Sequence, residues 1–487
     1  MEILNTPGVY IKELQTLPAS IAAVETAIPA FIGHTEKANE DPNSVPGDNK
    51  LLQVPTRITS MLEYEAHFGG ANKEVPRVTV TDRYNGVDGQ PAAMIDRVVK
   101  VEQPVAVSAF KMYHSLQMYF ANGGGPCYIV SVNGYGGAVT AGDETTFTSL
   151  RGGLAILEKV DEPTLIVFPD YLSVANYKSV YDAALAQCEK LADRFVVMDV
   201  KDNSISPLND VKEFRDNGIG MGNLKYGAVY YPNIKTSLNY RYDATLPITH
   251  NKTYIGTGAP NPAIPVSNTP ALNSLEGSDP SLFRAVEAEL RKLYLDLPPS
   301  GSVAGIYARV DAQRGVWKAP ANVDVRNVIE PKVKVTHEQQ GSLNVDPSSG
   351  KSVNVIRTFA GKGPLVWGAR TLAGNDNEWR YIPVRRLYIF IEESVKKATE
   401  FVVFEPNDAN TWLRVKTMIE NFLSKLWRDG ALAGAKTDDA FFVKVGLGQT
   451  MNALDILEGR MNVEIGLAAV RPAEFIILKF SHKLQQS

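Results

Sequence analysis

The stretch 121–132, ANGGGPCYIVSV, joins a helical pattern to an apolar strand through three consecutive glycines. Glycine is a common helix terminator because it adopts left-handed backbone conformations without steric cost. The run 127–132 that follows is largely apolar on both faces, which is typical of a strand covered on both sides of a sheet. Upstream, apolar residues recur at steps of three and four and predict a helix: Val107, Phe110, Tyr113, Leu116 and Phe120.

The same alternation of strands and helices continues on both sides of this stretch. A short buried strand is predicted at 28–33, and a helix is predicted at 172–193. Apolar runs bounded by turn residues predict further strands at four places: 164–168, 195–200, 228–231 and 303–308. Buried strands interleaved with helices indicate an α/β layer fold with a mainly parallel sheet.

Three polar segments interrupt this alternation. They are rich in turn-forming residues such as Gly, Pro and Asn, and they span 38–55, 71–104 and 239–280. Such residues favour turns and loops over regular elements, so we expect all three segments to be surface insertions.

The C-terminal third has its own pattern. Apolar periodicity predicts one helix across 384–395 and a second that begins at a cap, Asp408 or Asn410, and ends at Gly430. Two further runs predict strands, the second of them half-buried because apolar and polar residues alternate: 401–404 and 461–469.

Composition excludes several classes of protein. The 487 residues are 44% hydrophobic and 21% charged, which is ordinary for a globular chain of roughly two to four domains. The net charge of −4 argues against a nucleic-acid binder, whose phosphate contacts need an excess of Lys and Arg. No apolar run approaches the roughly 20 residues that span a bilayer, so no membrane insertion is expected. Two cysteines, Cys127 and Cys188, are too few for a disulfide framework and fit a reduced cytoplasm.

Two segments of the sequence match catalytic motifs only in part. Gly350-Lys351-Ser352 ends like a phosphate-binding loop, but Val345 stands where that motif needs its first glycine. His337-Glu338 begins like a zinc-protease motif, but Gly341 replaces the second histidine. No catalytic residue, metal or cofactor is therefore predicted. A cytoplasmic oligomeric α/β enzyme without a recognisable motif stays open as the alternative, because catalytic triads are spatial rather than sequential.

Both ends of the chain carry residues that favour strands. An unpaired strand is an aggregation hazard, so each end needs a partner. For the C-terminal strand, one possibility is an internal hairpin with 461–469, and the other is strand exchange between subunits. Opposite charges favour exchange, since residues 1–25 carry a net charge of −2 and residues 470–487 carry +2. The residues predicted to lie in these arms are Val9, Tyr10, Ile11, Leu14, Phe475, Ile476, Ile477, Leu478 and Phe480.

A series of short motifs runs in order along the chain, at 7–10, 54–60, 68–69, 122–128, 298–305, 315–322, 366–372, 379–381, 385–386, 404–407 and 471–475. The series resembles that of the tail sheath proteins of contractile phage tails and related contractile injection systems. The three polar insertions show no such pattern.

The resemblance implies a particular domain organisation. It implies an inner α+β domain built from both chain termini, inserted outer α/β domains, and extended N- and C-terminal β-arms. In this chain the N-terminal arm corresponds to 1–22, the outer domains to 23–355, and the inner domain with its arm strand to 356–487.

The resemblance also implies a function. Sheath proteins are structural subunits, not enzymes, that polymerise as stacked hexameric rings around an inner tube and contract to drive the tube through a target envelope. The implied partners are other copies of the chain, the inner tube protein, the baseplate, and the tail-terminator or cap proteins. Assembly is expected in the bacterial cytoplasm, within a phage tail or a tail-like particle that is either released or anchored to a membrane.

The helical region 408–430 is the predicted contact with the tube. Its apolar stripe faces the core and leaves charged side chains for other surfaces, and a sliding contact is expected to be polar and modest. The predicted tube-contact residues are Arg414, Lys416, Lys425 and Arg428. The alternative is an ordinary solvated face.

Overall fold

A computed structural model describes residues 21–43, 48–86, 93–170, 176–201, 206–255, 264–265 and 270–478. The chain separates into two compact units. One unit is Glu25–Arg386, and the other combines Met1–Val24 with Leu387–Ser487. The division into an arm at 1–22, outer domains at 23–355 and an inner domain at 356–487 stays a prediction.

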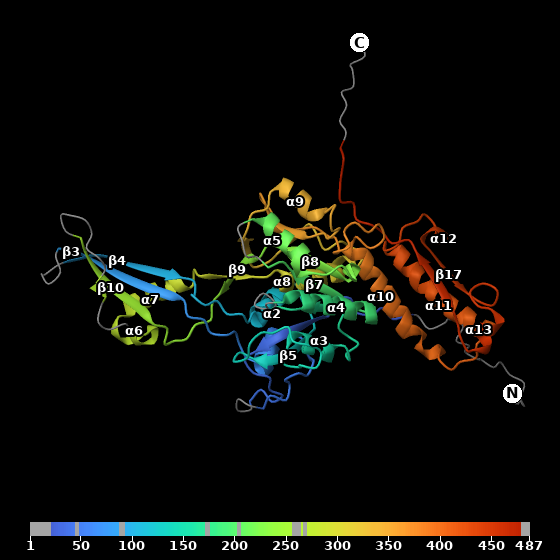
Figure 1. The fold of residues 1–487 in the computed structure, drawn as a ribbon, viewed down its shortest axis with the longest axis horizontal. Helices are drawn as coiled ribbons and strands as arrows, with labels where there is room; N and C mark the ends of the chain where they lie inside the picture. The colour runs from blue at the N-terminus through green and yellow to red at the C-terminus, as the bar shows by residue number, and fades with distance from the viewer. Residues whose placement is uncertain are drawn as a thin grey trace, which may run out of the picture. The chain divides into compact units, whose positions relative to one another are not determined.

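The first unit is built around a nine-stranded sheet (Figure 1). The strand order is β13-β16-β15-β8-β7-β6-β1-β5-β2. The bounds are β1 (Pro29–Thr35), β2 (Thr56–Ile58), β5 (Cys127–Gly134), β6 (Leu165–Val167), β7 (Phe195–Asp199), β8 (Gly227–Tyr231), β13 (Val323–Asp324), β15 (Asn354–Phe359) and β16 (Gly363–Trp367).

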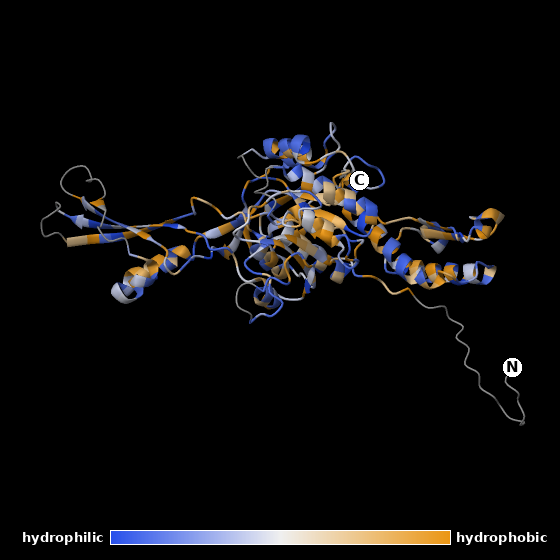
Figure 2. Ribbon diagram, turned by 60° about the horizontal axis from the view of Figure 1, so that its bottom comes forward, coloured by the Kyte–Doolittle hydropathy of each residue, from blue (hydrophilic) through white to orange (hydrophobic). Residues whose placement is uncertain are grey.

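The predicted parallel sheet is confirmed. The strands from β15 through β8, β7, β6 and β1 to β5 pair in parallel, and only the two edges are antiparallel. Helices α2 (Met112–Ala121) and α8 (Ser300–Arg314) pack together on this sheet, and α3 (Leu150–Leu157) and α4 (Tyr177–Leu191) form a second packed pair. The central strands are therefore buried throughout, and Figure 2 shows them as mainly hydrophobic.

The rest of this unit surrounds the sheet with short elements. A three-stranded sheet has the order β12-β9-β14. Its strands and the remaining helices are β9 (Ile234–Asn239), β12 (Tyr294–Leu297), β14 (Val328–Pro331), α1 (Met61–Phe68), α5 (Pro207–Glu213) and α9 (His337–Asn344). Of the predicted insertions, 38–55 forms no helix or strand in its described residues, 38–43 and 48–55.

The other two predicted insertions are not simple surface loops. Together they form a four-stranded sheet of order β11-β10-β3-β4, so residues far apart in the sequence share one core. Its elements are β3 (Arg77–Asn85), β4 (Ala93–Glu102), β10 (Ile248–Ile255), β11 (Ile264–Pro265), α6 (Leu272–Ser278) and α7 (Pro280–Leu290). Val78, Val80 and Ile248 pack there against Leu282 and Val286. The high polar content of both segments concealed this core, because in β3 polar residues alternate with the buried Val78 and Val80 and in β10 only Ile248 is buried.

The strand predicted at 303–308 is wrong, because this run lies inside helix α8. An apolar run of six residues does not distinguish a buried strand from a buried helix. Small residues let α8 approach α2 closely. A Cβ atom at Gly305 would lie 2.3 Å from the carbonyl oxygen of Tyr119, and one at Gly301 would lie 2.6 Å from that of Ser115.

The second unit contains most of one long helix, all of another, and a small sheet. Helix α10 (Ile382–Thr399) and helix α11 (Ala409–Arg428) confirm the two predicted C-terminal helices. Asp408 is the N-cap, since its side chain accepts the backbone N–H of Thr411 at 2.9 Å. The remaining elements are α12 (Thr437–Ala440), β17 (Phe441–Val445), α13 (Ala453–Leu457) and β18 (Val463–Leu467), the last of which confirms the strand predicted at 461–469.

The strand predicted at 401–404 is wrong. After α10 the chain makes a short 3-10 turn at Glu400–Val402, and Phe404 has a left-handed backbone with a φ of 70°. Val403 and Phe404 are exposed, so no neighbouring strand pairs with this run. Residues with high β-propensity form a strand only where a partner strand is available.

Candidate assembly surfaces

The C-terminal tail is the most conspicuous exposed apolar segment among the described residues. Residues 471–478 form no helix or strand. Four consecutive large apolar side chains lie in this segment, and each is 72–81% exposed: Phe475, Ile476, Ile477 and Leu478. Water-exposed apolar runs of this size mark interaction sites, because leaving them uncovered forfeits the free energy of burial.

The structure tests only part of the predicted arms. Phe480 and all four N-terminal arm residues, Val9, Tyr10, Ile11 and Leu14, lie outside the described residues. Strand exchange by either arm therefore stays a prediction.

The small sheet of the second unit has only two strands in the described part of the chain. Strands β17 and β18 pair antiparallel from Phe441 opposite Leu467 to Val445 opposite Val463. The ring of Phe442 covers Gly466, and Lys444 lies 3.8 Å from Glu464 across the ladder. Strand β17 packs against α11, and the outer edge of each strand can accept another strand. Strand β17 was not predicted from the sequence, although FFVKV at 441–445 contains a clear β-forming pattern.

The internal hairpin that the sequence left open is not formed by the described residues. Strand β18 takes β17 as its partner instead. The chain after β18 makes only a short return, in which Val470 N–H donates to the carbonyl of Ala431 at 3.2 Å. From residue 471 through Leu478 the tail pairs with no strand.

Helix α11 presents one apolar face and one polar face. Val415, Ile419, Phe422 and Leu426 recur at steps of three and four and are buried, as the sequence predicted. The predicted tube-contact cations do not share a single face. At about 100° per residue, Arg414, Lys425 and Arg428 lie within about 60° of one another.

Lys416 lies about 200° around the helix from Arg414, on the other flank. It pairs there with Glu420 at 3.7 Å, as neighbours one turn apart do. By contrast, Arg414, Lys425 and Arg428 have no carboxylate within ion-pair distance among the described residues. We call these three residues the basic stripe of α11. Arg414 lies 5.4 Å from the ring centroid of Phe401, and Arg428 Nε donates to the carbonyl of Ser424 at 3.2 Å.

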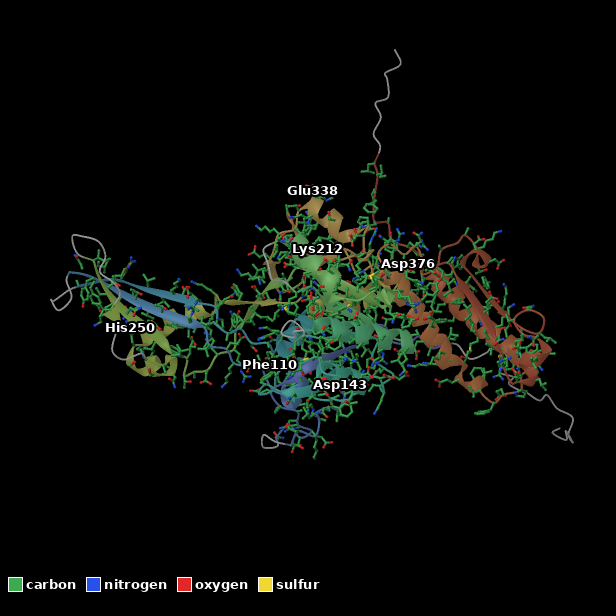
Figure 3. The ribbon with its side chains drawn as sticks, viewed as in Figure 1. Phe110, Asp143, Lys212, His250, Glu338 and Asp376 are labelled. Atoms are coloured by element: carbon green, nitrogen blue, oxygen red, sulfur yellow. The ribbon has the colours of Figure 1, made fainter. Side chains whose placement is uncertain are left out.

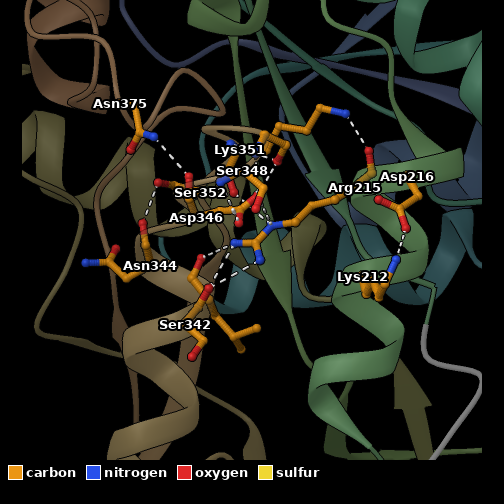
Figure 4. Close-up of polar contacts among 12 residues, drawn as sticks. Lys212, Arg215, Asp216, Ser342, Asn344, Asp346, Ser348, Lys351, Ser352 and Asn375 are labelled. Carbon is orange, nitrogen blue, oxygen red and sulfur yellow. Dashed lines mark hydrogen bonds and ion pairs between the residues drawn. The ribbon is translucent and has the colours of Figure 1, made fainter.

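The segment that ends like a phosphate-binding loop has a structural role (Figure 4). Lys351 is 3% exposed, and its Nζ donates to the backbone carbonyls of Arg215 and Ile219. Ser352 Oγ donates to the carbonyl of Asn344 at 2.5 Å. The lysine of a phosphate-binding loop faces the phosphates, whereas this one ties two chain segments together.

Metal-ligating side chains do not gather into a candidate site in the described part of the chain. No group of His, Cys, Asp and Glu side chains there has the arrangement of a metal site. Figure 3 shows Lys212, His250 and Glu338 on three separate elements, α5, β10 and α9. Among the described helices, none combines the length and the apolar composition that a membrane crossing requires.

Two buried carboxylates lie where the parallel strands end, which is where open α/β sheets usually bind ligands. Asp170 follows β6 and accepts the backbone N–H groups of His34 at 2.7 Å and Lys111 at 2.6 Å. Asp199 ends β7 and accepts the backbone N–H of Ser300 at 2.8 Å. Because both side chains are at most 1% exposed, they hold the backbone together instead of facing a crevice. The sequence offered no signal for either role, since each partner is distant along the chain.

Asp199 predicts a pH dependence of stability. Burial raises the pKa of this carboxyl from 3.8 to about 7, and the donor from Ser300 offsets only part of that effect. The stabilisation by the protonated form is complete below the unfolded-state pKa and is lost as the pH rises through 7. Between the unfolded-state pKa and pH 7, the free energy of unfolding of the wild type should fall relative to that of the Asp199→Asn variant. We expect this difference to reach up to about 1.4 kcal/mol per pH unit.

Chemical unfolding of both proteins across this pH range measures that difference. An exposed carboxylate serves as the control, and Asp438→Asn should follow the wild-type profile. Parallel profiles for the wild type and Asp199→Asn would contradict the assigned pKa.

Two family models match adjacent parts of the chain. The phage tail sheath protein central domain matches residues 152–372, and the phage tail sheath C-terminal domain matches residues 374–483. Curated relatives match over shorter segments. The tail sheath protein of Burkholderia phage BcepMu is 30% identical over 144 residues, which is 28% of this chain and 30% of that protein. The tail sheath protein of Enterobacteria phage T4 is 24% identical over 130 residues, 26% of this chain and 19% of that protein. The chain thus spans less than a third of each of these two relatives.

Solved structures match over nearly the whole length. The sheath complex of the extracellular contractile injection system PVC, in its contracted state, is 31% identical and has a TM-score of 0.61. That match covers 99% of both chains. The contracted helical sheath of the anti-feeding prophage is also 31% identical with a TM-score of 0.61, and the match covers 99% of this chain and 100% of that one.

Proposed function

Because this chain belongs to the phage tail sheath family, we propose that it polymerises as stacked six-subunit rings around an inner tube and contracts to drive that tube through a target envelope. The sheath is a structural polymer, and no catalytic step is assigned to it. Two of the proposed partners, other copies of the chain and a baseplate, are supported by similarity to contracted sheaths and to a baseplate complex. The inner tube, a cap protein and assembly in the cytoplasm are further parts of the proposal.

The exposed tail carries the proposal. Phe475, Ile476, Ile477 and Leu478 present apolar side chains to water, and the two-stranded sheet β17–β18 lacks further strands in the described residues. The tail of one copy can therefore add a strand to the β17–β18 sheet of another copy. Each copy then both donates and accepts a strand, and such head-to-tail exchange propagates into rings or helices instead of closing as a dimer.

Electron microscopy of the purified full-length chain tests this function. A sheath subunit forms tubes, whereas an oligomeric enzyme forms small closed particles of fixed size. Uniform small particles at every concentration and salt condition would contradict the sheath assignment.

The basic stripe of α11 is our proposed tube contact, and it leads to a mutational prediction. We expect the tube exterior to offer acidic groups to this stripe. Replacing Arg414, Lys425 and Arg428 by Glu should therefore prevent filling of the sheath with tube, because negative charges then face one another. The fold should be retained, since these cations have no carboxylate partner among the described residues. Co-assembly of sheath with tube protein, imaged by electron microscopy, measures the fraction of filled, extended sheaths.

Lys416 provides the matched control. It lies on the same helix but on the other flank, paired with Glu420. We expect Lys416→Glu to assemble around the tube normally, and wild-type co-assembly should weaken with salt, since exposed charges are screened beyond about 8 Å at physiological ionic strength. Filled sheaths from the triple variant would show that another surface holds the tube.

A further inference from the structure

A polar pocket of about 320 Å³ opens beside the C-terminal end of α8, within the unit Glu25–Arg386. Its wall comes from the last turns of α8 and from the segment 315–326, which contains one of the motifs noted in the sequence. The charged side chains that line it are Arg309, Arg314, Lys318, Asp324 and Arg326. Four of these five are cations, so the pocket carries a formal charge of +3.

The single carboxylate does not neutralise this charge. Asp324 forms ion pairs with two guanidinium groups, since its carboxylate lies 3.3 Å from that of Arg309 and 3.5 Å from that of Arg326. Arg314 and Lys318 have no carboxylate within ion-pair distance among the described residues. The Nζ of Lys318 donates only to the carbonyl of Ala319, at 3.2 Å.

Burial and the neighbouring Arg314 both lower the pKa of the Lys318 ammonium. Two cations held close together in a partly desolvated site repel one another. A bound anion would relieve that repulsion, and guanidinium and ammonium groups together form strong hydrogen bonds to oxyanions.

The pocket is held in place from several sides. Strand β13 pairs with β16, so that Asp324 lies opposite Leu365 in the central sheet. The buried side chain of Asn122 clamps the backbone of Arg326, accepting its N–H at 2.8 Å and donating to its carbonyl at 3.2 Å. The Arg309 side chain packs directly over Gly123, since a Cβ atom at Gly123 would lie 2.9 Å from the Cβ atom of Arg309. Such fixed walls lower the entropy cost of binding a ligand.

Charge on the rest of the chain indicates where the anion comes from. Since the whole chain carries −4 and the pocket +3, the remainder carries −7 and offers a surplus of carboxylates. In a polymer made of one kind of chain, the neighbours of each pocket are copies that carry this surplus of carboxylates. Resting on the proposed function, we propose that this pocket is an oxyanion site that takes an acidic side chain of a second copy of this chain in the assembled sheath.

Pyrophosphate is the probe for the site. Equilibrium dialysis at constant ionic strength measures its binding to the full-length, unassembled chain. Replacing Arg314 and Lys318 by Gln should weaken binding at least about tenfold, which corresponds to about 1.4 kcal/mol. The control is Arg291→Gln with Lys292→Gln, which removes the same charge from exposed side chains directly after α7 and should leave binding unchanged. Absent binding by the wild type, or equal binding by the Arg314/Lys318 variant, overturns the oxyanion site.

The assembled sheath identifies the source of the anion. If a neighbouring copy fills the pocket, assembled wild-type sheath should bind little pyrophosphate, and the Arg314/Lys318 variant should form fewer tubes than the Arg291/Lys292 control. Equal pyrophosphate binding by assembled and unassembled chains overturns the assignment to a second copy. Failure of the wild type to form tubes contradicts the proposed function instead, and dialysis of the unassembled chain still decides whether the site exists.

Discussion

Removal of residues 474–487 is expected to abolish tube formation and to leave a folded, unassembled chain. The described part of this segment exposes four large apolar side chains and pairs with no strand, so we expect the core to survive its deletion. Each backbone hydrogen bond of an exchanged strand contributes only about 0.5–1.5 kcal/mol, but several bonds recur on every subunit of the polymer. Electron microscopy measures assembly, and circular dichroism measures the retained fold.

Side-chain alternation gives a sharper version of this experiment. In a strand, Ile476 and Leu478 face one side, and Phe475 and Ile477 face the other. Replacing both residues of one pair by Ser should abolish tube formation when that pair faces the neighbour's core. Replacing the other pair should reduce tube formation less. Normal tubes from the truncated chain would mean that the tail contributes nothing to assembly.

Asp311→Ala is expected to cost about 3–5 kcal/mol of stability, because it leaves a buried guanidinium without its partner. Asp311 and Arg386 form a bidentate ion pair, in which Nη1 and Nη2 of the guanidinium donate to Oδ1 at 3.0 Å and Oδ2 at 2.5 Å. Their side chains are 6% and 3% exposed. Thr26 completes the cluster, donating its hydroxyl to Asp311 at 2.6 Å and accepting from Arg386 through its carbonyl at 2.8 Å. The Arg386 guanidinium also lies 4.5 Å from the ring centroid of Tyr307. Chemical unfolding of the full-length chain measures the loss.

A double variant distinguishes loss of the pair from loss of packing. Asp311→Ala combined with Arg386→Met removes both charges, so it should be more stable than Asp311→Ala alone. Asp216→Ala is the control for an exposed ion pair, since the side chains of Asp216 and its partner Lys212 are 51% and 73% exposed, and it should cost far less. A double variant as unstable as the single variant would assign the loss to packing.

Five strands of the large sheet, β1, β5, β6, β7 and β8, could be predicted because their signals are local, whereas β2, β13, β15 and β16 were not predicted. The strands at 127–134, 195–199 and 227–231 are apolar runs that end at turn residues, and burial on both faces requires that composition. The helices α10 and α11 could also be predicted from their apolar periodicity, and the start of α11 from its cap at Asp408. Where an apolar run was short, as at 303–308, composition did not separate helix from strand, and contact with α2 decided the outcome.

The candidate assembly surfaces were only partly predictable. The apolar tail is visible in the sequence, and its exposure is a property of the folded chain. The cations of α11 are also visible, but the helix period separates Lys416 from Arg414, Lys425 and Arg428. The basic pocket beside α8 could not be inferred, because Asn122, Arg309 and Arg326 meet only after the sheet has formed.

The sequence by itself determined the α/β class, the parallel core and the membership of the sheath family, because periodicity, turn residues and ordered motifs act over short stretches of chain. Tertiary structure alone decided three other features: the four-stranded sheet shared by 71–104 and 239–280, the pairing of β18 with β17, and the buried positions of Asp199 and Asp311. Each of these depends on partners that are distant along the chain. The free energy of such contacts comes from burial and charge pairing in the folded state, which no local pattern records.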